Sequence, residues 1–530
     1  MDSTSAWAPL RNAVYRNLFI AQLVSNIGLW MQTVGAQWFL VDRGASPTMI
    51  ALVQTAGLAP TLLLSLPAGV LADLVDRRRL LIATSVYSVL GAAALAAIAW
   101  VGVLSPVSLL AMTFLLACGS ALTSPAWQAI QPELVPREQI PAASSLGSVT
   151  VNAARAVGPA LGGVVVAVAG PTAVFALNAV SYVAVIGALV LWHRPRTDRA
   201  VGRESPGSAI VSGLRYVRSA PIVRRIMLRS AIFAFPASTL WALLPLASSE
   251  HLHLGATGYG AILGVLGVGA VAGVVVIPRA RRRFDANTIL AASALLYAAG
   301  VVAAGCLPLA AAVPLLLLAG TAWIGTLTVL NAAVQLSVAT WVRARAMSVY
   351  LLVFMGSQAV GSFLWGLVAN AIGLGPTLAV AAGLLVLVAA SVRVLPLRAE
   401  TGTLDRAVST AWPAPTVVFD VDPDDGPVLV TVTWRIRPGD EREFVRAMAA
   451  VGRSRRRTGG YHWGLFRSES DADAMLEHFM VPSWSQYVTQ TQTRWTASDH
   501  EAIETARAHT IPDSVVQRSY VAVADRAGGA

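Results

Sequence analysis

The sequence from Gly69 to Arg79 reads Gly-Val-Leu-Ala-Asp-Leu-Val-Asp-Arg-Arg-Arg and joins two long apolar segments through a short basic connector. An apolar helix of about 20 residues crosses the hydrocarbon core of a bilayer, which is roughly 30 Å thick. Arginine stays on the cytoplasmic side because positive charge is not carried across the membrane during insertion. This stretch therefore predicts two membrane-spanning helices that meet at the cytoplasmic surface.

The same alternation continues in both directions up to about residue 396. Every second connector is basic, whereas the connectors between them carry a single basic residue, Arg43. The arginine-rich stretches are 77–79, Arg137, 194–229, 279–283, Arg343 with Arg345, and Arg393 with Arg398. The predicted spans are 17–41, 48–72, 80–102, 105–127, 142–168, 171–192, 226–249, 257–280, 286–307, 311–338, 344–370 and 375–396. This pattern predicts a multi-pass protein of the cell membrane with both termini in the cytoplasm.

The composition excludes an ordinary soluble protein. The chain is 55% hydrophobic and 13% charged, whereas soluble domains are about 25% charged. Closed β-barrels are excluded as well, because they consist of short alternating strands rather than continuous apolar runs. The net charge of +11 comes from arginines that flank the spans, where they meet anionic lipid headgroups. We therefore expect membrane lipids, and no nucleic acid, as partners.

The longest interior connector divides the spans into two sets of six. It covers 193–225 and separates residues 1–192 from residues 226–396. A repeat supports this division, because Ala-Val-Gly at 156–158 and Gly163 recur as Ala-Val-Gly at 359–361 and Gly366. We expect an α-helical membrane protein of twelve transmembrane helices in two pseudo-symmetric halves, joined by a cytoplasmic linker. Such parallel repeats are typical of secondary transporters whose substrate site lies near the midplane between the halves.

The composition changes after the last span. Residues 397–426 contain several prolines and aspartates and are predicted to be a linker. Residues 427–530 then show a β-α-β-β-α-β order, which predicts a ferredoxin-like soluble domain in the cytoplasm. Its predicted strands are 428–437, 461–467, 474–481 and 515–523, and its predicted helices are 440–457 and 483–508. Dimerisation through this domain is an expectation that follows from its predicted fold.

The stretch 69–79 resembles the loop signature of the major facilitator superfamily. In that family the glycine lets two helices approach closely, and the aspartate caps a neighbouring helix and pairs with loop arginines. The resemblance implies these gating roles for Gly69, for Asp73 and for Arg77, Arg78 and Arg79. The chain departs from the family pattern at Leu74 and Asp76, where arginine and glycine are common.

Further motifs narrow the resemblance. Residues 152–159 are similar to the Gly-Pro motif of exporters in this superfamily, which implies that Gly158 and Pro159 bend and pack their helix. Residues 16–19, 28–32, 132–137 and 459–466 are similar to the enterobactin-exporter-like branch, called transmembrane secretion effectors. Members of that branch export siderophores, drugs and similar small molecules. The resemblance covers nearly the whole chain and implies an exporter rather than an enzyme.

Polar side chains within the spans are the candidates for contact with cargo, because burying them in lipid is costly. Arg155 is an arginine inside a span, and it suits either an anionic or phenolate cargo or a structural pair with a nearby carboxylate or backbone carbonyls. The first span has five residues at intervals of three or four positions, so they share one helical face toward the cavity or a partner helix: Gln22, Asn26, Trp30, Thr33 and Gln37. The full candidate set is Gln22, Asn26, Trp30, Gln37, Gln54, Trp127, Gln128, Asn152, Arg155, Trp241, Asn331 and Gln335.

The sequence also bears on the source of energy. A phosphate-binding loop of the Gly-x-x-x-x-Gly-Lys type is excluded because the chain has no lysine. We expect protons to drive transport, with Asp42 as the coupling residue, and we expect no metal and no cofactor. Three alternatives stay open: an importer, a membrane anchor for a C-terminal ligand sensor or monooxygenase-like enzyme, and a scaffold that transports nothing.

Overall fold

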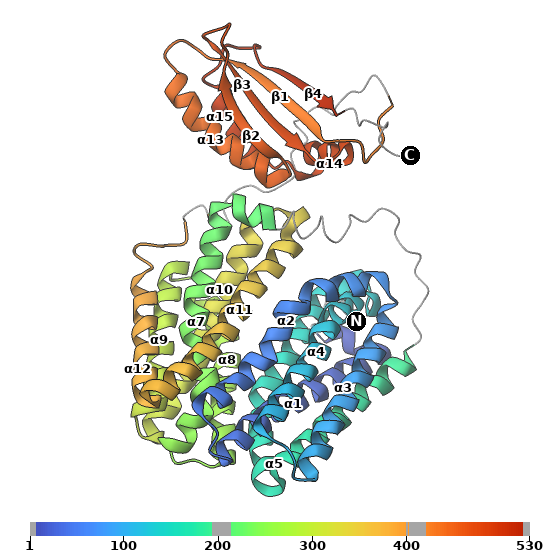
Figure 1. Cartoon of the computed structure of the whole chain (residues 1–530), viewed down its shortest axis with the longest axis vertical. Helices are drawn as coiled ribbons and strands as arrows, with labels where there is room; N and C mark the ends of the chain where they lie inside the picture. The colour runs from blue at the N-terminus through green and yellow to red at the C-terminus, as the bar shows by residue number, and fades with distance from the viewer. Residues whose placement is uncertain (1–6, 193–213, 399–400, 402–419, 523–530) are drawn as a thin grey trace. The chain divides into compact units, whose positions relative to one another are not determined.

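A computed structural model describes residues 7–192, 214–398, 401 and 420–522. The chain is mostly helical up to residue 390 (Figure 1). Its apolar helices are α1 Ala13–Asp42, α2 Pro47–Leu74, α3 Arg77–Trp100, α4 Pro106–Leu134, α5 Ile140–Leu191, α7 Pro221–Glu250, α8 Ala256–Ala280, α9 Ala286–Cys306, α10 Leu309–Ser337, α11 Arg343–Ile372 and α12 Leu374–Ala390. In the described part, ten helices are long and apolar enough to cross a membrane, and α12 is a shorter apolar helix.

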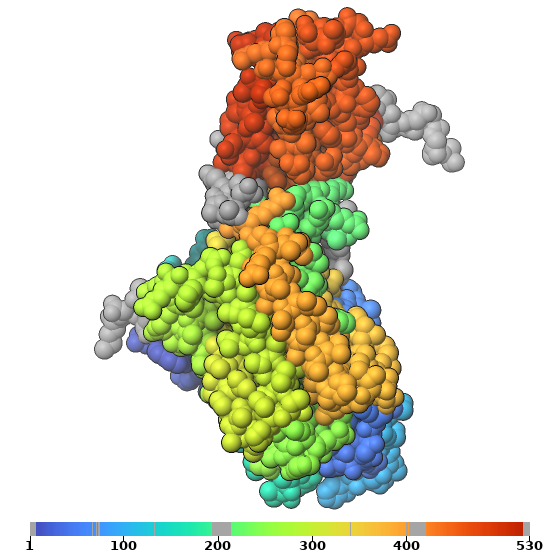
Figure 2. Space-filling view, turned by 90° about the vertical axis from the view of Figure 1, so that its left-hand side faces the viewer, coloured from blue at the N-terminus to red at the C-terminus, as the bar shows by residue number. Residues whose placement is uncertain are grey.

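The surfaces of these helices are apolar. Leu387 on α12 is 63% exposed, and Leu296 on α9 is also exposed. The space-filling view shows both helices at the surface, α12 in orange and α9 in yellow-green (Figure 2). Apolar side chains that point away from the core are expected where the surrounding medium is lipid. The protein is therefore an integral membrane protein with many passes.

The helices begin where the sequence supplies caps. Ser46 accepts a hydrogen bond from the backbone N–H of Met49 at the start of α2, and Pro47 follows it as the first helical residue. Asp76 caps α3 by accepting from the N–H of Arg79 at 2.9 Å. Such caps satisfy backbone donors that have no partner inside the helix. The short connectors are therefore both turns and start signals.

α5 holds two predicted spans in one continuous run. Its backbone leaves the helical conformation at Gly170, where φ is 77°. This left-handed conformation favours glycine, because any side chain would be strained there. The predicted spans 142–168 and 171–192 thus correspond to the two arms of α5 on either side of Gly170.

Contacts group the chain into two units. The first consists of Met1–Val201, Arg229–Leu330 and Leu351–Pro396. The second consists of Gly202–Leu228, Asn331–Tyr350 and Leu397–Ala530. The second unit thus combines the C-terminal domain with the ends of α7, α10 and α11 that lie next to arginine-rich connectors. Residues 193–213 of the predicted central linker and residues 399–400 and 402–419 of the second linker lie outside the described residues.

Within the first unit, glycines bring helices of the two halves to backbone distance. A Cβ atom on Gly163 of α5 would lie 2.5 Å from the carbonyl oxygen of Ala256 in α8. A Cβ atom on Gly366 of α11 would lie 3.0 Å from the Cα of Thr48 in α2. Thr48 also donates its hydroxyl to the carbonyl oxygen of Gly366 at 3.0 Å. The repeated glycines therefore form equivalent contacts, α5 on α8 and α11 on α2 (Figure 1).

The C-terminal part forms an antiparallel sheet with the order β2-β3-β1-β4. Its strands are β1 Val428–Arg435, β2 Tyr461–Arg467, β3 Ala474–Val481 and β4 Val516–Val521, and its helices are α13 Glu441–Thr458, α14 Trp484–Thr489 and α15 Ala497–Arg507. Val430 pairs with Phe479 of β3 and with Ser519 of β4, so β1 is central. Trp434 and Phe444 are fully buried between β1 and α13. The predicted strands and the first predicted helix coincide with the observed ones to within a few residues, whereas the predicted helix 483–508 is divided into α14, a π-helical turn at Gln490–Arg494 and α15.

Candidate functional site

Three of the candidate residues meet in the first unit although they come from different helices. The guanidinium carbon of Arg155 in α5 lies 5.7 Å from the ring centre of Trp30 in α1. The ring of Trp30 lies 5.9 Å from that of Trp241 in α7. The arginine and one tryptophan thus come from the first half, and the other tryptophan comes from the second. The polar stripe of α1 and the span with the Gly-Pro motif therefore meet the second half here.

Two buried polar atoms of this cluster make no hydrogen bond within the described part of the protein. The Nε atom of Arg155 and the indole Nε1 of Trp241 are buried and have no hydrogen-bond partner among the described residues. No ion pair of Arg155 is present there either, so the structure does not show the predicted alternative of a carboxylate partner. Buried donors without acceptors are costly, and an arginine over an indole face keeps its charge available to a second partner. An anionic or hydrogen-bond-accepting ligand fits these donors.

Aromatic side chains of the second half surround Trp241. The ring of Trp323 in α10 lies 5.6 Å from Trp241 and 5.4 Å from Phe354 in α11. Tyr297 in α9 lies 5.8 Å from Trp323. The indole Nε1 of Trp323 is also buried without a hydrogen-bond partner among the described residues. Sequence reasoning missed Trp323, although a tryptophan in the middle of a span is a signal of the same kind as Trp241.

The first half holds a smaller polar crevice. Gln22 donates to Asn26 at 3.0 Å, so two members of the stripe bond to each other along α1. Gln22 also lines a cavity of about 20 Å³ together with Trp127 and Gln131 of α4. The remaining residues around this cavity are Tyr15, Leu18, Phe19, Leu134, Gly147 and Thr150. The volume suits a water molecule rather than a cargo molecule.

Gln37 is placed in the contact between the halves. Its amide nitrogen donates to the carbonyl oxygen of Trp241 at 3.3 Å, and its amide oxygen accepts from the hydroxyl of Tyr259 at 2.5 Å. The side chain is 1% exposed, so no surface is left for a ligand. Gln32 and Asn178, which sequence reasoning missed, form a similar buried hydrogen bond between α1 and α5. These amides join helices, as polar residues in membrane bundles often do.

The other candidates are spread over the helices. Gln54 in α2 is half-buried, and Gln128 in α4 is exposed and donates to Ser124. Asn152 bonds to the carbonyl oxygen of Ser148 within its own helix. Asp42 is the exposed last residue of α1. Asn331 is half-buried and Gln335 is exposed, and both belong to the second unit.

The arginines of the predicted gating motif are held by the first half. Arg77 donates to Glu133 Oε1 at 2.7 Å and to the carbonyl oxygen of Ala129 at 3.1 Å. Arg78 donates to the carbonyl oxygens of Leu189 and Val190 at the end of α5. These bonds tie the start of α3 to the ends of α4 and α5. Sequence reasoning did not connect Glu133 with Arg77.

Two details differ from the family pattern. A Cβ atom on Gly69 would meet nothing within 4 Å, so the expected close helix approach is absent at this residue. The helix start after the connector is capped by Asp76, the residue that departs from the family pattern. The side chain of Asp73 lies outside the described side chains, so its predicted role stays a prediction.

The Gly-Pro motif makes contacts within and between the halves. A Cβ atom on Gly158 would lie 2.6 Å from the Cβ of Trp30, so this glycine lets α5 pack directly on α1. A Cβ atom on Gly260 of α8 would collide with the carbonyl oxygen of Pro159. The motif therefore positions Trp30 beneath Arg155 and brings α5 against the other half.

The C-terminal domain encloses a charged cluster of its own. Glu477 in β3 is fully buried and accepts hydrogen bonds from Arg455 at 3.0 Å, Trp463 at 3.1 Å and Trp434 at 3.3 Å. Arg455 lies 5.1 Å from the ring of Trp495. Paired buried charges of this kind are typical of a rigid core.

Aromatic and histidine side chains of this domain contact other groups of the domain. Trp463 packs on Gly452 and bonds to Glu477, and His478 stacks on Phe466 with ring centres 5.0 Å apart. Tyr487 is buried, which raises its pKa, and its hydroxyl accepts from Gln517 at 3.0 Å. None of them lines a cavity that the structure shows in its described part.

The whole chain matches one protein family. The sequence model of the family described as "Transmembrane secretion effector" matches residues 4–527, which includes the C-terminal domain.

Several curated relatives are named as transporters or efflux proteins. The chain is 26% identical over 264 residues to the staphyloferrin A transporter of Staphylococcus aureus, which covers 49% of this chain and 66% of that protein. It is 25% identical over 411 residues to the multidrug efflux pump Tap of Mycobacterium tuberculosis, which covers 74% of this chain and 97% of that protein. It is 21% identical to the macrolide efflux protein A of Streptococcus pyogenes, over 48% of this chain and 64% of that protein.

Solved structures support the fold of the helical part. The nucleoside transporter NupG, in a mutant form, superposes with a TM-score of 0.61 at 12% identity and covers 72% of this chain and 99% of that chain. A bacterial homologue of the human lysosomal transporter Spinster superposes with a TM-score of 0.60 at 16% identity, over 73% of this chain and 97% of that chain. The helical part therefore has the fold of these transporters.

Proposed function

The chain belongs to the transmembrane secretion effector family of the major facilitator superfamily, and we propose that it exports a small molecule by alternating access, driven by protons. The observation that carries the proposal is the cluster of Arg155, Trp30 and Trp241, with its unsatisfied buried donors between the halves. Relatives named as efflux pumps and as a siderophore transporter support export and a small organic cargo. The cargo class is a siderophore, drug or secondary metabolite.

The chemistry of the cluster narrows the cargo within this class. Arg155 supplies a positive charge, and Trp241 and Trp323 supply buried indole donors in an aromatic wall. A planar molecule with a carboxylate or phenolate group satisfies the charge and stacks on the rings. A neutral aliphatic molecule leaves the donors unsatisfied and binds more weakly.

The proposed architecture has twelve transmembrane helices, with the two arms of α5 as the fifth and sixth. Both termini and the C-terminal domain then lie in the cytoplasm, since the arginine-rich connectors face that side. The strand order β2-β3-β1-β4 with helices between β1 and β2 and between β3 and β4 supports a ferredoxin-like fold for residues 427–530. Dimerisation through that domain stays a prediction.

The glycine contacts support rocking of the halves. Gly163 and Gly366 hold α5 on α8 and α11 on α2 near the arginine-poor connectors. Alternating access requires these contacts to form in one state and open in the other. We propose that Arg77 and Arg78, with Asp73, control the opposite end, which carries the arginine-rich connectors, and that Asp42 carries the proton.

Replacing Gly163 by leucine tests the rocking step. The side chain would collide with the backbone of α8, so this state cannot close and export should fall to about a tenth or less. Gly187→Leu is the matched control, because Gly187 lies on the same helix and a Cβ atom there meets nothing within 4 Å. Equal export by both variants, at equal protein level, would contradict the proposed role of this contact.

Export itself is tested in cells that express the wild-type chain or Arg155→Gln. Efflux of catecholate siderophores and anionic aromatic drugs should depend on the chain, fall in the variant and stop when a protonophore collapses the gradient. Vesicles of known orientation separate export from import, because each direction accumulates cargo on a different side. If no compound is moved in either direction, the transport proposal is wrong.

A further inference from the structure

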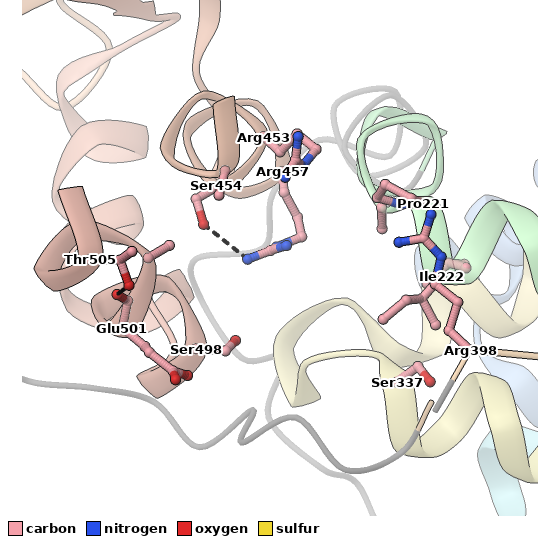
Figure 3. Close-up of a pocket in the computed structure, with 14 residues that line it drawn as sticks. Pro221, Ile222, Ser337, Arg398, Arg453, Ser454, Arg457, Ser498, Glu501 and Thr505 are labelled. Atoms are coloured by element: carbon pink, nitrogen blue, oxygen red, sulfur yellow. Dashed lines mark hydrogen bonds between the residues drawn. The ribbon is translucent and has the colours of Figure 1, made fainter. Parts of the chain in front are cut away.

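The second unit contains a cavity that the transport cycle proposed above does not use. Its volume is about 330 Å³, within the range of small-molecule sites. One side is formed by α13 and α15 of the C-terminal domain, and the other by the start of α7 and the end of α10 (Figure 3). All of its lining residues belong to the second unit. The cavity therefore lies where the C-terminal domain meets the ends of two membrane helices.

Three arginines line this cavity. Arg453 and Arg457 come from α13, and Arg398 comes from the segment after α12 (Figure 3). Arg457 is neutralised by Asp499 and also donates to Ser454 at 3.0 Å. Within the described part of the chain, Arg398 and Arg453 make no ion pair. One carboxylate, Glu501, also lines the cavity, so the balance of charge is positive.

A buried hydroxyl adds a second, independent observation. Ser337 at the end of α10 lines the cavity and is 2% exposed. Its hydroxyl oxygen is buried and has no hydrogen-bond partner among the described residues. A buried polar atom of this kind usually has a partner, so its partner is expected to be a ligand or an ordered water. The apolar part of the lining comes from Ala450, Ala502, Ile222 and Val223.

We propose that this cavity binds an organic anion with an apolar body, which bridges the C-terminal domain and the ends of α7 and α10. The acidic group is held by Arg398 and Arg453, and the apolar body lies on the alanines and Ile222. Arginine suits carboxylate and phosphate groups because its donors form a planar fork. A free aromatic carboxylate and the headgroup of an anionic lipid share this chemistry.

Other contacts within the second unit already join the C-terminal domain to the segments next to the membrane helices. Arg494 of the C-terminal domain lies 4.9 Å from the ring of Trp341, in the connector between α10 and α11. Arg215 donates to the carbonyl oxygen of Gly459 at 3.0 Å. A ligand in the cavity would add to these contacts and hold the domain on the helix ends. A bound ligand would thereby restrain the connector between α10 and α11, which has to move when these helices move.

The test uses the full chain in nanodiscs. Every protein in it carries Arg155→Gln, so that the cluster in the first unit does not contribute to the measured binding. The probe is 2-naphthoate, with the neutral 2-naphthamide as its matched control, and binding is measured by calorimetry. We expect naphthoate to bind at least about tenfold more tightly than the amide, because charge-assisted hydrogen bonds are lost in the amide. Equal affinity for the two probes would overturn the proposal.

Three variants locate the site. Arg453→Gln and Arg398→Gln should each weaken naphthoate binding about tenfold, whereas Glu501→Gln should strengthen it about threefold by removing a repulsive charge. Arg446→Gln is the control, since Arg446 is an exposed residue of α13 outside the cavity. Size-exclusion profiles and melting temperatures check that each variant is folded. Unchanged binding in folded Arg453→Gln and Arg398→Gln would also overturn the proposal.

The source of the anion is distinguished by the lipid. If phosphatidylglycerol nanodiscs lower the apparent affinity for naphthoate relative to phosphatidylcholine nanodiscs, an anionic headgroup occupies the cavity. If the affinity is the same in both, the natural ligand is a soluble anion. Either result supports an anion site, and neither depends on whether the chain exports cargo.

Discussion

Two arginines of this protein lie over tryptophan rings, Arg455 buried and Arg155 half-buried, and only one of them has a counter-charge. Arg455 in the C-terminal domain is 3% exposed, lies 5.1 Å from the ring of Trp495 and bonds to the buried carboxylate of Glu477. Arg155 between the membrane halves lies 5.7 Å from the ring of Trp30, and no carboxylate pairs with it in the described part of the chain. The same residue type and the same stacking partner therefore occur with and without a counter-charge.

The counter-charge separates an arginine with a structural role from one with a functional role. A buried charge that is paired with an opposite charge fixes a core, because removing either partner leaves the other uncompensated. A buried charge without a partner costs stability, and it is retained where a ligand supplies the missing group. By this criterion the Arg455 cluster stabilises the domain and the Arg155 cluster is kept for a ligand.

The largest expected effect is on the paired arginine. Glu477→Gln leaves the charge of Arg455 buried without its carboxylate, and this should lower the stability of the C-terminal domain by about 3–5 kcal/mol. Hydrogen exchange of the amides of β1 and β3 in the full chain measures the change. Glu443→Gln is the control, because Glu443 makes only an exposed contact with Arg446 at 4.0 Å.

A double replacement sharpens this point. Arg455→Met combined with Glu477→Met removes both charges, so the domain should recover to within about 1 kcal/mol of the wild type. If Glu477→Gln alone leaves exchange unchanged, the domain does not depend on the counter-charge of Arg455, and the contrast between the two arginines is lost.

The second effect concerns the unpaired arginine and should appear in activity rather than stability. Arg155→Gln should lower efflux of an anionic cargo about tenfold or more, because a charge-assisted bond to the cargo is lost. The melting temperature should stay the same or rise, since no partner within the protein is lost. Arg155→Lys keeps the charge but loses the planar stack on Trp30, so its efflux should be intermediate.

Thermal unfolding of purified protein and efflux from cells are compared for the same variants. A fall in melting temperature of many degrees in Arg155→Gln, with efflux lost in proportion to folded protein, would assign Arg155 to the structure. The comparison with Arg455 would then fail.

The smallest expected effect is on stability, and it concerns an arginine that is paired but partly exposed. Arg77 and Glu133 form an ion pair at 2.7 Å with side chains 20% and 22% exposed, so solvent screens it. Glu133→Gln should cost at most about 1 kcal/mol, and less at high salt, because Arg77 keeps its bond to Ala129. Melting at low and high salt measures this, and a loss of several kcal/mol would place the pair with Arg455 instead.

The helices and strands could be predicted from the sequence because the patterns that indicate them are local. The apolar spans end at capped connectors, such as Ser46 before α2 and Asp76 before α3. The strands of the C-terminal domain follow from an alternation in which Val428, Val430 and Val432 are buried. Hydropathy and periodicity report such features residue by residue.

The site could be predicted from the sequence only in part, because its contacts join helices that are distant in the chain. The polar stripe of α1 contains Trp30, which meets Arg155, and Gln37, which joins the halves, and the two share one helical face. Periodicity identifies that face and does not say which neighbour covers each turn. The pairing of Arg77 with Glu133 likewise depends on how α3 and α4 pack, which no local pattern encodes.

The contacts at Gly163 and Gly366 have a consequence for how such proteins diversify. The contact at Gly163 is made by backbone atoms, and the contact at Gly366 adds only the Cβ of Ala51 and the hydroxyl of Thr48, so few side chains have to be matched across the moving surface. Residues around Arg155 and Trp241 are then free to change without a compensating change in the hinge. Related proteins that keep these glycines are able to change their cargo specificity while the contacts between the moving helices stay the same. A library that varies only the aromatic residues around Trp241 should therefore yield many variants that still transport.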